Sequence, residues 1–585
     1  MLRILEEADY HFTGIFRVED GLPVVYPDAQ MKGPVPVGRT ETGGAKEGDK
    51  VSARIVKRGR RHFDHRAAVT AVFGSSPAPP AGAVCCEAIL ADNGIEKQFP
   101  PQVLEEARQI QEKGISQREI DNRLDLRGEI IFTIDGADTK DIDDAISLTR
   151  LENGWGLGVH IADVSHYVRP QSALDTEAFG RGTSVYYANA VIPMLPKELS
   201  NGICSLNPQE DRLAFSALMR LDEDGGLVEY DFRKTVIRSR VKGVYSEINQ
   251  ILDGTAEEAI HKKYDGLEPI LHQMKALADR LARRRSQRGS LDLESTEAKI
   301  LIGEDGRVQD IVPRQSGVSE GMIEEFMLVA NEAAASFGLA RELPFLFRIH
   351  EDPSAEKLEA LAELLKVLGL DTVRIKPGVL QPSELQAVLK AVKGTDMQML
   401  VNSQLLRSMA KARYSEVNKG HFGLVLQKYS HFTSPIRRYP DLAIHRIMSE
   451  SLKGTAAQEM QRRFGRFVQD AAVHSSTAEQ RAMSVERSCE DCYKAEYMNA
   501  HIGDEFQGTV VSAVEFGLFI ALPDTCEGLL HTDNMPDGEY VCDDMVSLKN
   551  LTNGMEYRVG DPIRVKVINA NVNSGKIDFA LADED

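Results

Sequence analysis

The sequence of 585 residues lacks any hydrophobic run that approaches the length of a membrane span. Such a span needs about 18 or more consecutive apolar residues, so we expect no membrane association. The N-terminal stretch MLRILEEADYHF introduces charge at once and no apolar segment follows it, so we expect no signal peptide. Together these absences predict a cytoplasmic protein.

Cysteine is scarce, odd in number and scattered along the chain. The seven cysteines are Cys85, Cys86, Cys204, Cys489, Cys492, Cys526 and Cys542. This usage argues against a disulfide framework and favours a reducing compartment. Cys489 and Cys492 form a C-x-x-C motif, but no second Cys or His pair follows at zinc-site spacing. The surrounding residues are typical of a helix, so we expect both thiols on one helical face in a structural role.

Positive charge is in deficit, with 69 Lys and Arg against 89 Asp and Glu and a net charge of −20. A uniform acidic excess would disfavour nucleic acid, because affinity for phosphate comes from Lys and Arg. An acidic protein can nevertheless gather basic residues in a channel. Local basic runs occur at 57–61, at 280–288 (RLARRRSQR) and at Arg437–Arg438. For the first two runs, a solvated face is an equal alternative.

The chain changes character along its length, and residues 123–500 show no internal repeat. Residues 10–75 show short β-rich runs broken by Gly, Asp and Pro, and a Pro/Ala/Ser/Gly stretch follows at 75–83. Residues 84–122 favour helix, and residues 123–500 mix strands and helices. From Gly503 onward, short strands with Gly turns predict a small closed barrel. We therefore expect a multidomain α+β protein with four parts: 1–83, 84–122, 123–500 and 503–585.

Five aspartates lie within ten positions in TIDGADTKDIDDA, residues 133–145. Like charges at close range disfavour ionisation, so something must compensate for them. The flanking stretches IIFTI and AISL are apolar, which favours a loop pinned between buried strands over a solvated acidic run. A calcium EF-hand is excluded, because starts at Asp135 or Asp141 supply neither the Gly nor the spaced ligands. Magnesium fits better and would support metal-dependent phosphoryl chemistry.

The acidic stretch belongs to a series of blocks with a family resemblance. With VHIADVSHYV (159–168), RGTSVYYANAVIPMLPKELSNGICSLNP (181–208) and HFTSPIRRYPDLAIHR (431–446), it resembles the catalytic domain of the ribonuclease II and ribonuclease R family. The resemblance covers about 85–500 and is closer to ribonuclease R. It implies a central RNB-type catalytic domain and a Mg²⁺-dependent exoribonuclease, with one or two ions and Mn²⁺ as a possible substitute. Such an enzyme would degrade single-stranded RNA processively from the 3′ end to nucleoside 5′-monophosphates in RNA decay.

The resemblance also implies site residues. The metal and catalytic carboxylates would be Asp135, Asp141, Asp143 and Asp144, with Asp138 outside the set; Asp143 would orient the 3′-terminal nucleotide or a second metal. Arg437 would lie near the scissile phosphate and Glu486 near the 3′ end, where a solvated helical Glu is the alternative. Arg438 would either face substrate or pair with Asp441.

An aromatic clamp on the terminal bases is implied as well. Tyr186 in TSVYY would stack on them, and Tyr187 is the alternative register. Stacking is tolerant of base sequence and contributes about 1–3 kcal/mol per base. A second aromatic is expected near RGSLDLESTEAK, where the sequence has Leu293 and no aromatic residue. The clamp would then be one-sided, unless the register is shifted.

Both ends resemble RNA-binding modules of the OB type. Residues 503–583 resemble the S1 domain, in which Phe516, Phe519 and His531 match the base-facing pattern; for Phe519, a place in the barrel core is the alternative. Residues 10–75 resemble a cold-shock module more weakly, with GLPVVYPD in place of its aromatic-rich strand. The expected partner is single-stranded RNA, with no obligatory protein partner and a monomeric state. Two alternatives remain: a catalytically silent RNA-binding regulator, and a metal-dependent endoribonuclease.

Overall fold

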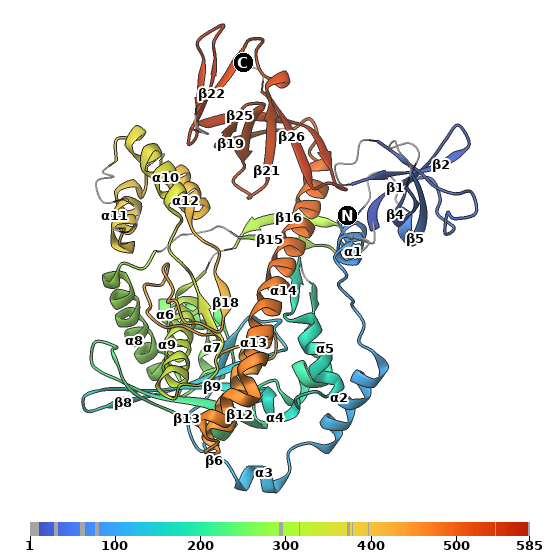
Figure 1. The fold of residues 1–585 in the computed structure, drawn as a ribbon. Coiled ribbons are helices and arrows are strands. Elements are labelled where there is room, and N and C mark those ends of the chain that lie inside the picture. The colour runs from blue at the N-terminus through green and yellow to red at the C-terminus, as the bar shows by residue number, and fades with distance from the viewer. Residues whose placement is uncertain are drawn as a thin grey trace.

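The structure is a computed structural model that describes residues 11–28, 33–58, 65–75, 81–188, 190–291, 297–314, 316–370, 375–376, 378, 380–395, 397–543 and 546–582. A large mixed α/β body fills the lower part of Figure 1, and two β modules lie above it. The long helix α14 rises from the body towards both modules. The expected architecture, a mixed catalytic body flanked by small β modules, is confirmed.

The N-terminal module is a five-stranded sheet in the order β3-β2-β1-β4-β5. Its strands are β1 (His11–Glu19), β2 (Leu22–Pro27), β3 (Val35–Pro36), β4 (Asp49–Lys57) and β5 (Arg66–Ser75). Asp20 and Gly21 connect β1 to β2 with φ angles of 49° and 74°, the conformation of a two-residue hairpin turn that favours Asp-Gly. A parallel bridge from Val37 to Ala67 joins the far edges of the sheet, so the module curls towards a barrel.

Three helices connect this module to the body: α1 (Gly82–Asp92), α2 (Pro101–Lys113) and α3 (Gln117–Asp121). Pro101 occupies the first turn of α2, where its missing N–H costs nothing, and Gly114 ends the helix with a φ of 62°. The helical character expected for this segment is therefore present, in three pieces.

The body is built on a five-stranded sheet in the order β6-β13-β12-β9-β8. The strands are β6 (Leu124–Asp125), β8 (Asp144–Leu151), β9 (Gly154–Ala162), β12 (Asp211–Leu221) and β13 (Leu227–Arg238). All neighbours are antiparallel except β6 and β13. Strand β9 is buried along almost its whole length, which is why it reads as a near-continuous apolar run.

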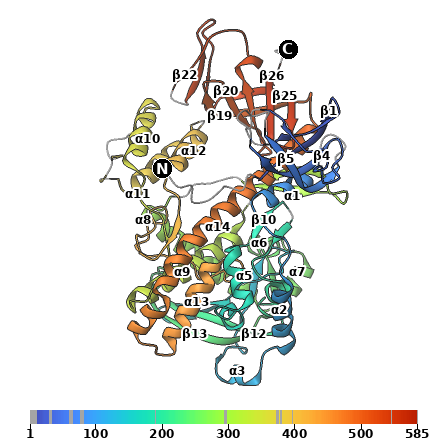
Figure 2. The same ribbon diagram turned by 45° about the vertical axis from the view of Figure 1, so that its right-hand side comes forward.

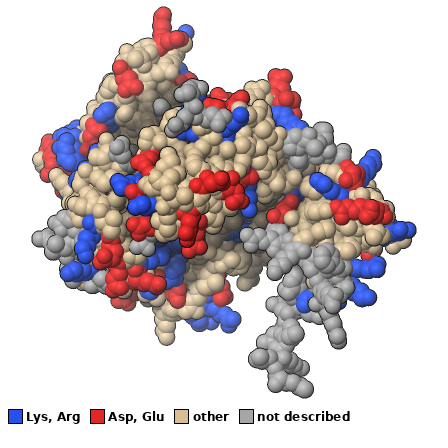
Figure 3. All heavy atoms as spheres, turned by 90° about the horizontal axis from the view of Figure 1, so that it is seen from above, with Lys and Arg blue, Asp and Glu red and all other residues tan. Residues whose placement is uncertain are grey.

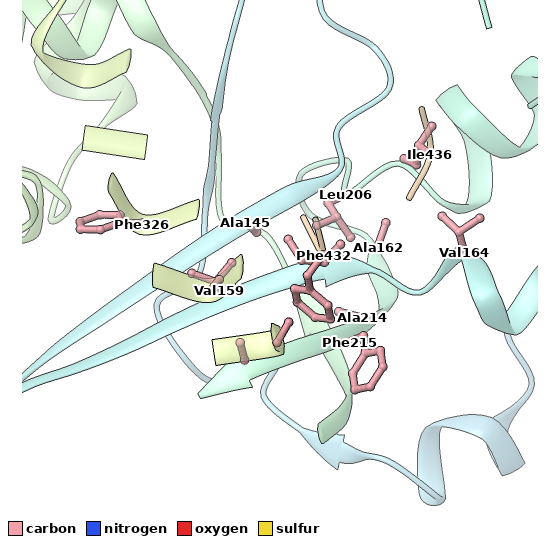
Figure 4. Packing of buried hydrophobic residues seen from close by; sticks show 14 of the residues in the cluster. Ala145, Val159, Ala162, Val164, Leu206, Ala214, Phe215, Phe326, Phe432 and Ile436 are labelled. Carbon is pink, nitrogen blue, oxygen red and sulfur yellow. The ribbon is translucent and has the colours of Figure 1, made fainter. Parts of the chain in front are cut away.

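One hydrophobic core includes apolar residues within and beside the acidic stretch, and Figure 4 shows part of it. It holds Ala145, which follows Asp144, and also Phe432 and Ile436, which precede Arg437. Fully burying a side chain as large as Phe432 or Ile436 contributes about 1.5–3 kcal/mol. Two segments almost 300 residues apart are thereby fixed to the same core, and this positions the site described below.

Short strands and helices complete the body around the sheet. They are β7 (Thr133–Asp135), α4 (Val164–Tyr167), α5 (Ala173–Arg181), β10 (Val185–Tyr187), β11 (Ala190–Ile192), the π-helix η2 (Glu198–Ile203), β14 (Lys242–Val244), α6 (Tyr245–Asp253), α7 (Glu258–Lys263), α8 (Glu268–Arg288), β15 (Ala298–Ile302), β16 (Val308–Pro313), α9 (Val318–Ala340), β17 (Phe347–Ile349), α10 (Ala355–Val367), α11 (Pro382–Val392), α12 (Gln398–Ser408), β18 (Arg413–Ser415) and α13 (Tyr439–Leu452). The basic run at the end of α8 is partly neutralised, because Arg285 pairs with Glu325 of α9 at 2.7 Å.

Helix α14 (Ala457–Asn499) spans 43 residues, or about 64 Å at 1.5 Å per residue. Helix α1 packs closely on it, because a Cβ at Gly82 would lie 2.7 Å from the Tyr493 ring. At this crossing Cys85 and Cys86 meet the C-x-x-C motif, and the Cys86 thiol lies 3.8 Å from the Cys489 carbonyl oxygen. Both thiols of the motif are buried and free, as expected for a packing role.

The C-terminal module is a closed barrel, as the Gly-rich strand pattern predicts. Its strands follow one another in the order β19 (Glu505–Val514), β20 (Gly517–Ala521), β21 (Glu527–His531), β26 (Lys576–Leu581) and β25 (Pro562–Asn571). The short helix η3 (Thr532–Asn534) follows β21, and a side sheet holds β22 (Tyr540–Asp543), β23 (Ser547–Asn550) and β24 (Glu556–Arg558).

The two β modules touch each other (Figure 2). The Lys50 side chain of β4 is 1% exposed; its ammonium pairs with Asp28 at 2.6 Å and donates to Asn573 Oδ1 at 3.3 Å. Seen from above, acidic and basic side chains are mixed across the modules (Figure 3). Within the described residues, no helix combines the length and apolarity needed to cross a membrane.

Candidate active site

The acidic loop is held at both ends by buried strands. Strand β7 delivers Asp135, and Asp144 is the first residue of β8. A bridge between Phe132 and Ile146 closes the loop at its base, and both residues are fully buried. The apolar flanks therefore pin the aspartates against the sheet, as their sequence predicts.

The carboxylates differ in how they are held. Asp143 is 4% exposed; its Oδ1 accepts a hydrogen bond from the Ile436 N–H at 2.8 Å, while its buried Oδ2 has no hydrogen-bond partner in the described part of the chain. Asp135 Oδ1 accepts from the Gly136 N–H at 2.7 Å and from the Thr139 hydroxyl at 3.0 Å. Asp138 is exposed, which agrees with its place outside the predicted set.

Burial raises the pKa of all four predicted site carboxyls, Asp135, Asp141, Asp143 and Asp144. For Asp144, burial and the neighbouring Asp135 charge raise the pKa to about 7. The Asp135 charge also raises the pKa of Asp141. The loop therefore holds more negative charge than its surroundings stabilise, which is the condition that an added cation would relieve.

Arg437 is the cation that these carboxylates share. Its charge lowers the pKa of each of the four against the larger effect of burial. Its Nε lies 3.7 Å from Asp143 Oδ2, and its Nη2 donates to the Ser434 hydroxyl at 2.9 Å. The guanidinium side chain remains 42% exposed, so it can still contact an incoming anion.

The neighbouring Arg438 points elsewhere. Its Nη2 donates to Asp441 Oδ1 at 2.7 Å, and Asp441 is fully buried. The same Asp441 oxygen accepts from the Ser434 N–H at 2.8 Å. Of the two alternatives given by the sequence, the structure shows the pair with Asp441, so Arg438 is engaged within the protein.

Tyr186 lies beside the carboxylates. Its side chain is 41% exposed, and burial together with the Asp141 and Asp143 charges raises the pKa of its hydroxyl. Its N–H donates to Glu486 Oε1 of α14 at 2.8 Å, so Glu486 holds the backbone of β10. The Tyr187 ring lies instead 6.0 Å from the Lys97 ammonium. Leu293, where the second clamp residue was expected, lies outside the described residues.

The β10–β11 hairpin, which carries Tyr186, is hydrogen-bonded to the turn formed by residues 434–438, called the arginine turn below. The Arg437 carbonyl oxygen accepts from the Ser184 N–H at 3.0 Å and from the Thr183 hydroxyl at 3.1 Å. The structure therefore brings together the four carboxylates, Arg437, Tyr186 and Glu486 from four separate segments.

Two polar residues that the sequence did not suggest complete the site. Lys242 donates from Nζ to the Ala137 and Thr139 carbonyl oxygens of the acidic loop at 2.8 and 2.6 Å. The Tyr245 hydroxyl is near enough to Asp144 and Asp135 that their charges add to the effect of burial in raising its pKa. Both residues reach the loop because β14 pairs in parallel with β7, a pairing of residues more than 100 positions apart that no local spacing reveals.

The four site carboxylates are chemically suited to bind a divalent cation. Carboxylate oxygens suit Mg²⁺, the four carboxyls have one arginine between them, and Asp143 Oδ2 is buried without a hydrogen bond. In their present positions, no three or more His, Cys, Asp or Glu side chains of the described chain form a metal-holding group. The fit is therefore one of charge and ligand type, and closing a ligand set would require the carboxylates to move together.

The C-terminal aromatic residues form a separate surface. Phe516 is 49% exposed, and its ring lies nearly parallel to that of His531 with centroids 6.2 Å apart. Phe519 is half-buried between Leu518 and Ile520, which are the residues that enter the barrel core. These three predicted residues lie between positions 516 and 531 of the C-terminal barrel, which lies above the body that carries the acidic loop (Figure 1).

Comparison with known proteins gives matches over the whole chain. The RNB domain matches residues 123–454, and the S1 RNA binding domain matches residues 500–582. Ribonuclease R 1 of Lactococcus lactis is 42% identical over 494 residues, which cover 84% of this chain and 60% of that protein. Ribonuclease R of Thermotoga maritima is 39% identical over 596 residues, which cover 100% of this chain and 82% of that protein.

Among solved structures, the chain is similar to Mycoplasma genitalium RNase R in complex with ribose methylated single-stranded RNA. The TM-score is 0.89 at 25% sequence identity, and the match covers 99% of this chain and 91% of that one. The acidic loop, the hairpin with Tyr186 and the arginine turn all fall within the matched RNB region.

Proposed function

Because this chain belongs to the ribonuclease R family of RNB-domain exoribonucleases, we propose that it degrades single-stranded RNA processively from the 3′ end with the help of Mg²⁺. The enzyme is a hydrolase of RNA degradation. The finer proposal is that each cycle cleaves the last phosphodiester and releases a nucleoside 5′-monophosphate.

The observation that carries the proposal is the convergence of four carboxylates, one half-exposed arginine and one half-exposed tyrosine. Asp135, Asp141 and Asp144 would hold one or two Mg²⁺ ions, with Mn²⁺ as a possible substitute. When bound, the metal supplies positive charge for the attacking and leaving oxygens of the phosphodiester.

The chain's own residues position the substrate. Arg437 offers a planar guanidinium towards the phosphate and would stabilise charge that develops during cleavage, because its exposed side is not committed to another residue in the described chain. Asp143 would orient the 3′-terminal nucleotide, and its position is fixed by the Ile436 N–H. Tyr186 would stack on the terminal base, which suits an enzyme that accepts any sequence.

Glu486 supports Tyr186 through the backbone hydrogen bond from the Tyr186 N–H to its carboxylate. The C-terminal barrel would bind the strand upstream through Phe516, Phe519 and His531, whose aromatic faces are outward or half-buried. We assign four domains, at 1–83, 84–122, 123–500 and 503–585, and expect a monomeric, cytoplasmic enzyme without an obligatory protein partner.

Two other functions compete with this one. A catalytically silent RNA-binding regulator would bind RNA without cleaving it, and an endoribonuclease would cut inside the strand. The presence of all four aspartates in one place favours an active nuclease. Digestion of a 5′-labelled single strand separates the three: progressive shortening supports the exonuclease, discrete internal fragments the endonuclease, and an intact bound strand the regulator.

The metal requirement needs its own test. Chelation with EDTA should stop cleavage, and Mg²⁺ or Mn²⁺ should restore it. An Asp143→Asn variant should bind the labelled strand but fail to shorten it. Undiminished cleavage by that variant, or in EDTA, would contradict the assignment of the carboxylates.

A further inference from the structure

The acidic loop has little internal support of its own. Among the described backbone hydrogen bonds, the one that closes within residues 136–140 runs from the Thr139 N–H to the Gly136 carbonyl oxygen at 3.2 Å. Five aspartates in and beside this segment repel one another, and a backbone without a regular ladder gives way easily to such repulsion. The conformation that presents the carboxylates must therefore be fixed from outside the loop.

Lys242 supplies that support on one side. Its ammonium group donates to the Ala137 and Thr139 carbonyl oxygens at 2.8 and 2.6 Å, so a single side chain bridges the turn. An ammonium has three donors and no acceptor, and two loop carbonyls therefore use most of its capacity.

The fold places Lys242 there by a close approach of two strands. Strand β14 pairs with β7 in parallel, with Lys242 opposite Thr133 and Val244 opposite Asp135. Between them, a Cβ at Gly243 would come within 2.5 Å of the Thr133 carbonyl oxygen, so only glycine permits this spacing. Lys242 therefore lies beside the loop because its strand, β14, pairs with β7, the strand that ends in Asp135.

The contact reaches a site carboxylate in one further step. Thr139, whose carbonyl oxygen accepts from Lys242, donates its hydroxyl to Asp135 Oδ1 at 3.0 Å. On the other side of the loop, the buried Ser205 hydroxyl donates to the Lys140 carbonyl oxygen at 2.7 Å and accepts from the Ile142 N–H at 3.1 Å. The loop is therefore braced at both ends, by Lys242 near Asp135 and by Ser205 near Asp141.

We propose that Lys242 is a positioning residue, which holds the backbone of the acidic loop in the conformation that lets its carboxylates close around the divalent cation. This inference rests on the proposed metal-dependent function. Lys242 makes its contact with main-chain oxygens and touches neither substrate nor metal in the proposal. It raises the affinity for the ion by reducing the reorganisation that the loop must undergo on binding.

A matched lysine separates this role from simple electrostatics. Lys140 lies in the same loop and carries the same charge, but its side chain is exposed. If Lys242 acted only through its charge, removing either lysine would relieve repulsion of the cation, so neither loss would weaken ion binding. If it acts by bracing the loop, only the loss of Lys242 matters.

The experiment measures Mn²⁺ binding to the full chain by electron paramagnetic resonance of the free ion, without RNA. The proteins are the wild type and the variants Lys242→Met, Lys242→Gln, Lys242→Arg, Lys140→Met and Asp141→Asn. Groups that orient metal ligands typically change metal affinity by about 10–100-fold, and we expect that range for Lys242→Met. Lys242→Gln should lose less and Lys242→Arg least, because amide and guanidinium groups can still donate to the carbonyls.

A second readout divides binding from turnover. At saturating Mn²⁺, cleavage by Lys242→Met should return to near the wild-type kcat, because binding of the ion then supplies the free energy that orders the loop. The loop amides of residues 137–140 should exchange hydrogen faster in Lys242→Met without ion, and the ion should suppress the difference.

The outcomes distinguish two failures. If the wild type binds Mn²⁺ and Asp141→Asn does not, but Lys242→Met binds Mn²⁺ as tightly as the wild type or more tightly, the inference about Lys242 is wrong and the proposed function stands. The same conclusion holds if Lys140→Met weakens binding as much as Lys242→Met does. If the wild type shows no Mn²⁺ binding that depends on Asp141, the proposed function itself fails. If Lys242→Met does not fold, the variants Lys242→Gln and Lys242→Arg decide. Mn²⁺ affinities equal to that of the wild type in both variants would refute the role.

Discussion

Replacing Arg437 with alanine should remove catalysis and spare the fold, whereas replacing Arg438 with alanine should damage the fold. The two residues adjoin in one motif, so any difference between them comes from the three-dimensional contacts alone. Arg437 is 42% exposed with its nearest carboxylate oxygen at 3.7 Å, and Arg438 is 17% exposed with Asp441 at 2.7 Å.

The size of each effect follows from those contacts. A long, half-exposed ion pair such as that of Arg437 contributes about 0–1 kcal/mol to stability. A preorganised cation facing charge that develops in the transition state is worth about 10²–10³-fold in kcat, or roughly 2.7–4 kcal/mol. Arg437→Ala should therefore fold with a nearly unchanged thermal midpoint and cleave RNA at least 100-fold more slowly, by order of magnitude.

Among the described residues, Arg438→Ala leaves the buried carboxylate of Asp441 with only the Ser434 N–H as a hydrogen-bond donor. Breaking a buried pair by removing one partner costs about 3–5 kcal/mol. The thermal midpoint of Arg438→Ala should fall by several degrees. At low temperature, the molecules of this variant that are folded should retain much of the wild-type kcat. The conservative variants provide controls: Arg437→Lys should keep part of the activity, and Arg438→Lys part of the stability.

The assay combines thermal unfolding with single-turnover cleavage of a 5′-labelled single strand, performed well below both midpoints. Catalytic loss is then read from correctly folded protein. The reasoning is refuted if Arg437→Ala unfolds as early as Arg438→Ala, or if Arg438→Ala is the slower enzyme per folded molecule.

Three further predictions follow from other contacts. Burial lowers the pKa of His160 to about 3 and of His445 to about 4, so both stay neutral when folded, whereas in the unfolded chain they bind protons as the pH falls through about 6.5. Their contribution to stability should therefore be fully present above about pH 7.5 and fall by about 1.4 kcal/mol per histidine by about pH 5.5, and an unchanged urea midpoint would contradict this. Gly82→Val should separate α1 from α14 by its clash with Tyr493 and lower the melting temperature, whereas Gly180→Val, in helix α5 with no atom near its added Cβ, serves as the comparison for a valine placed at a helical glycine. Phe516→Ala should weaken binding of a long RNA strand by about 1–3 kcal/mol with kcat on a short strand unchanged, as measured by fluorescence anisotropy.

Much of the site could be predicted because its signals are local. The acidic loop stands out as charge between apolar strands, and the burial of Phe132 and Ile146 shows why that pattern pins it. The C-terminal barrel follows from strand spacing and glycine turns.

What escaped prediction depends on pairings between distant segments. Lys242 meets the acidic loop only because β14 lies along β7, and the crossing of α1 with α14 brings Cys85 and Cys86 to a C-x-x-C motif about 400 residues later. The sequence also left open whether Arg438 faces substrate or pairs with Asp441, because both arginines are equally basic and the choice depends on where Asp143 and Asp441 lie in three dimensions.

The contact between the first and last β modules has a practical consequence. Lys50 of the N-terminal sheet is sealed by Asn573 of the C-terminal barrel. A chain shortened at its C-terminal end would open that ammonium to water, and one shortened at its N-terminal end would remove the Lys50 donor from Asn573 Oδ1 and leave it the Cys85 thiol at 3.5 Å. Truncation of either module therefore perturbs the surface of the other. A loss of RNA affinity after such a deletion can arise from the missing module or from the altered surface of the remaining one, and both must be tested.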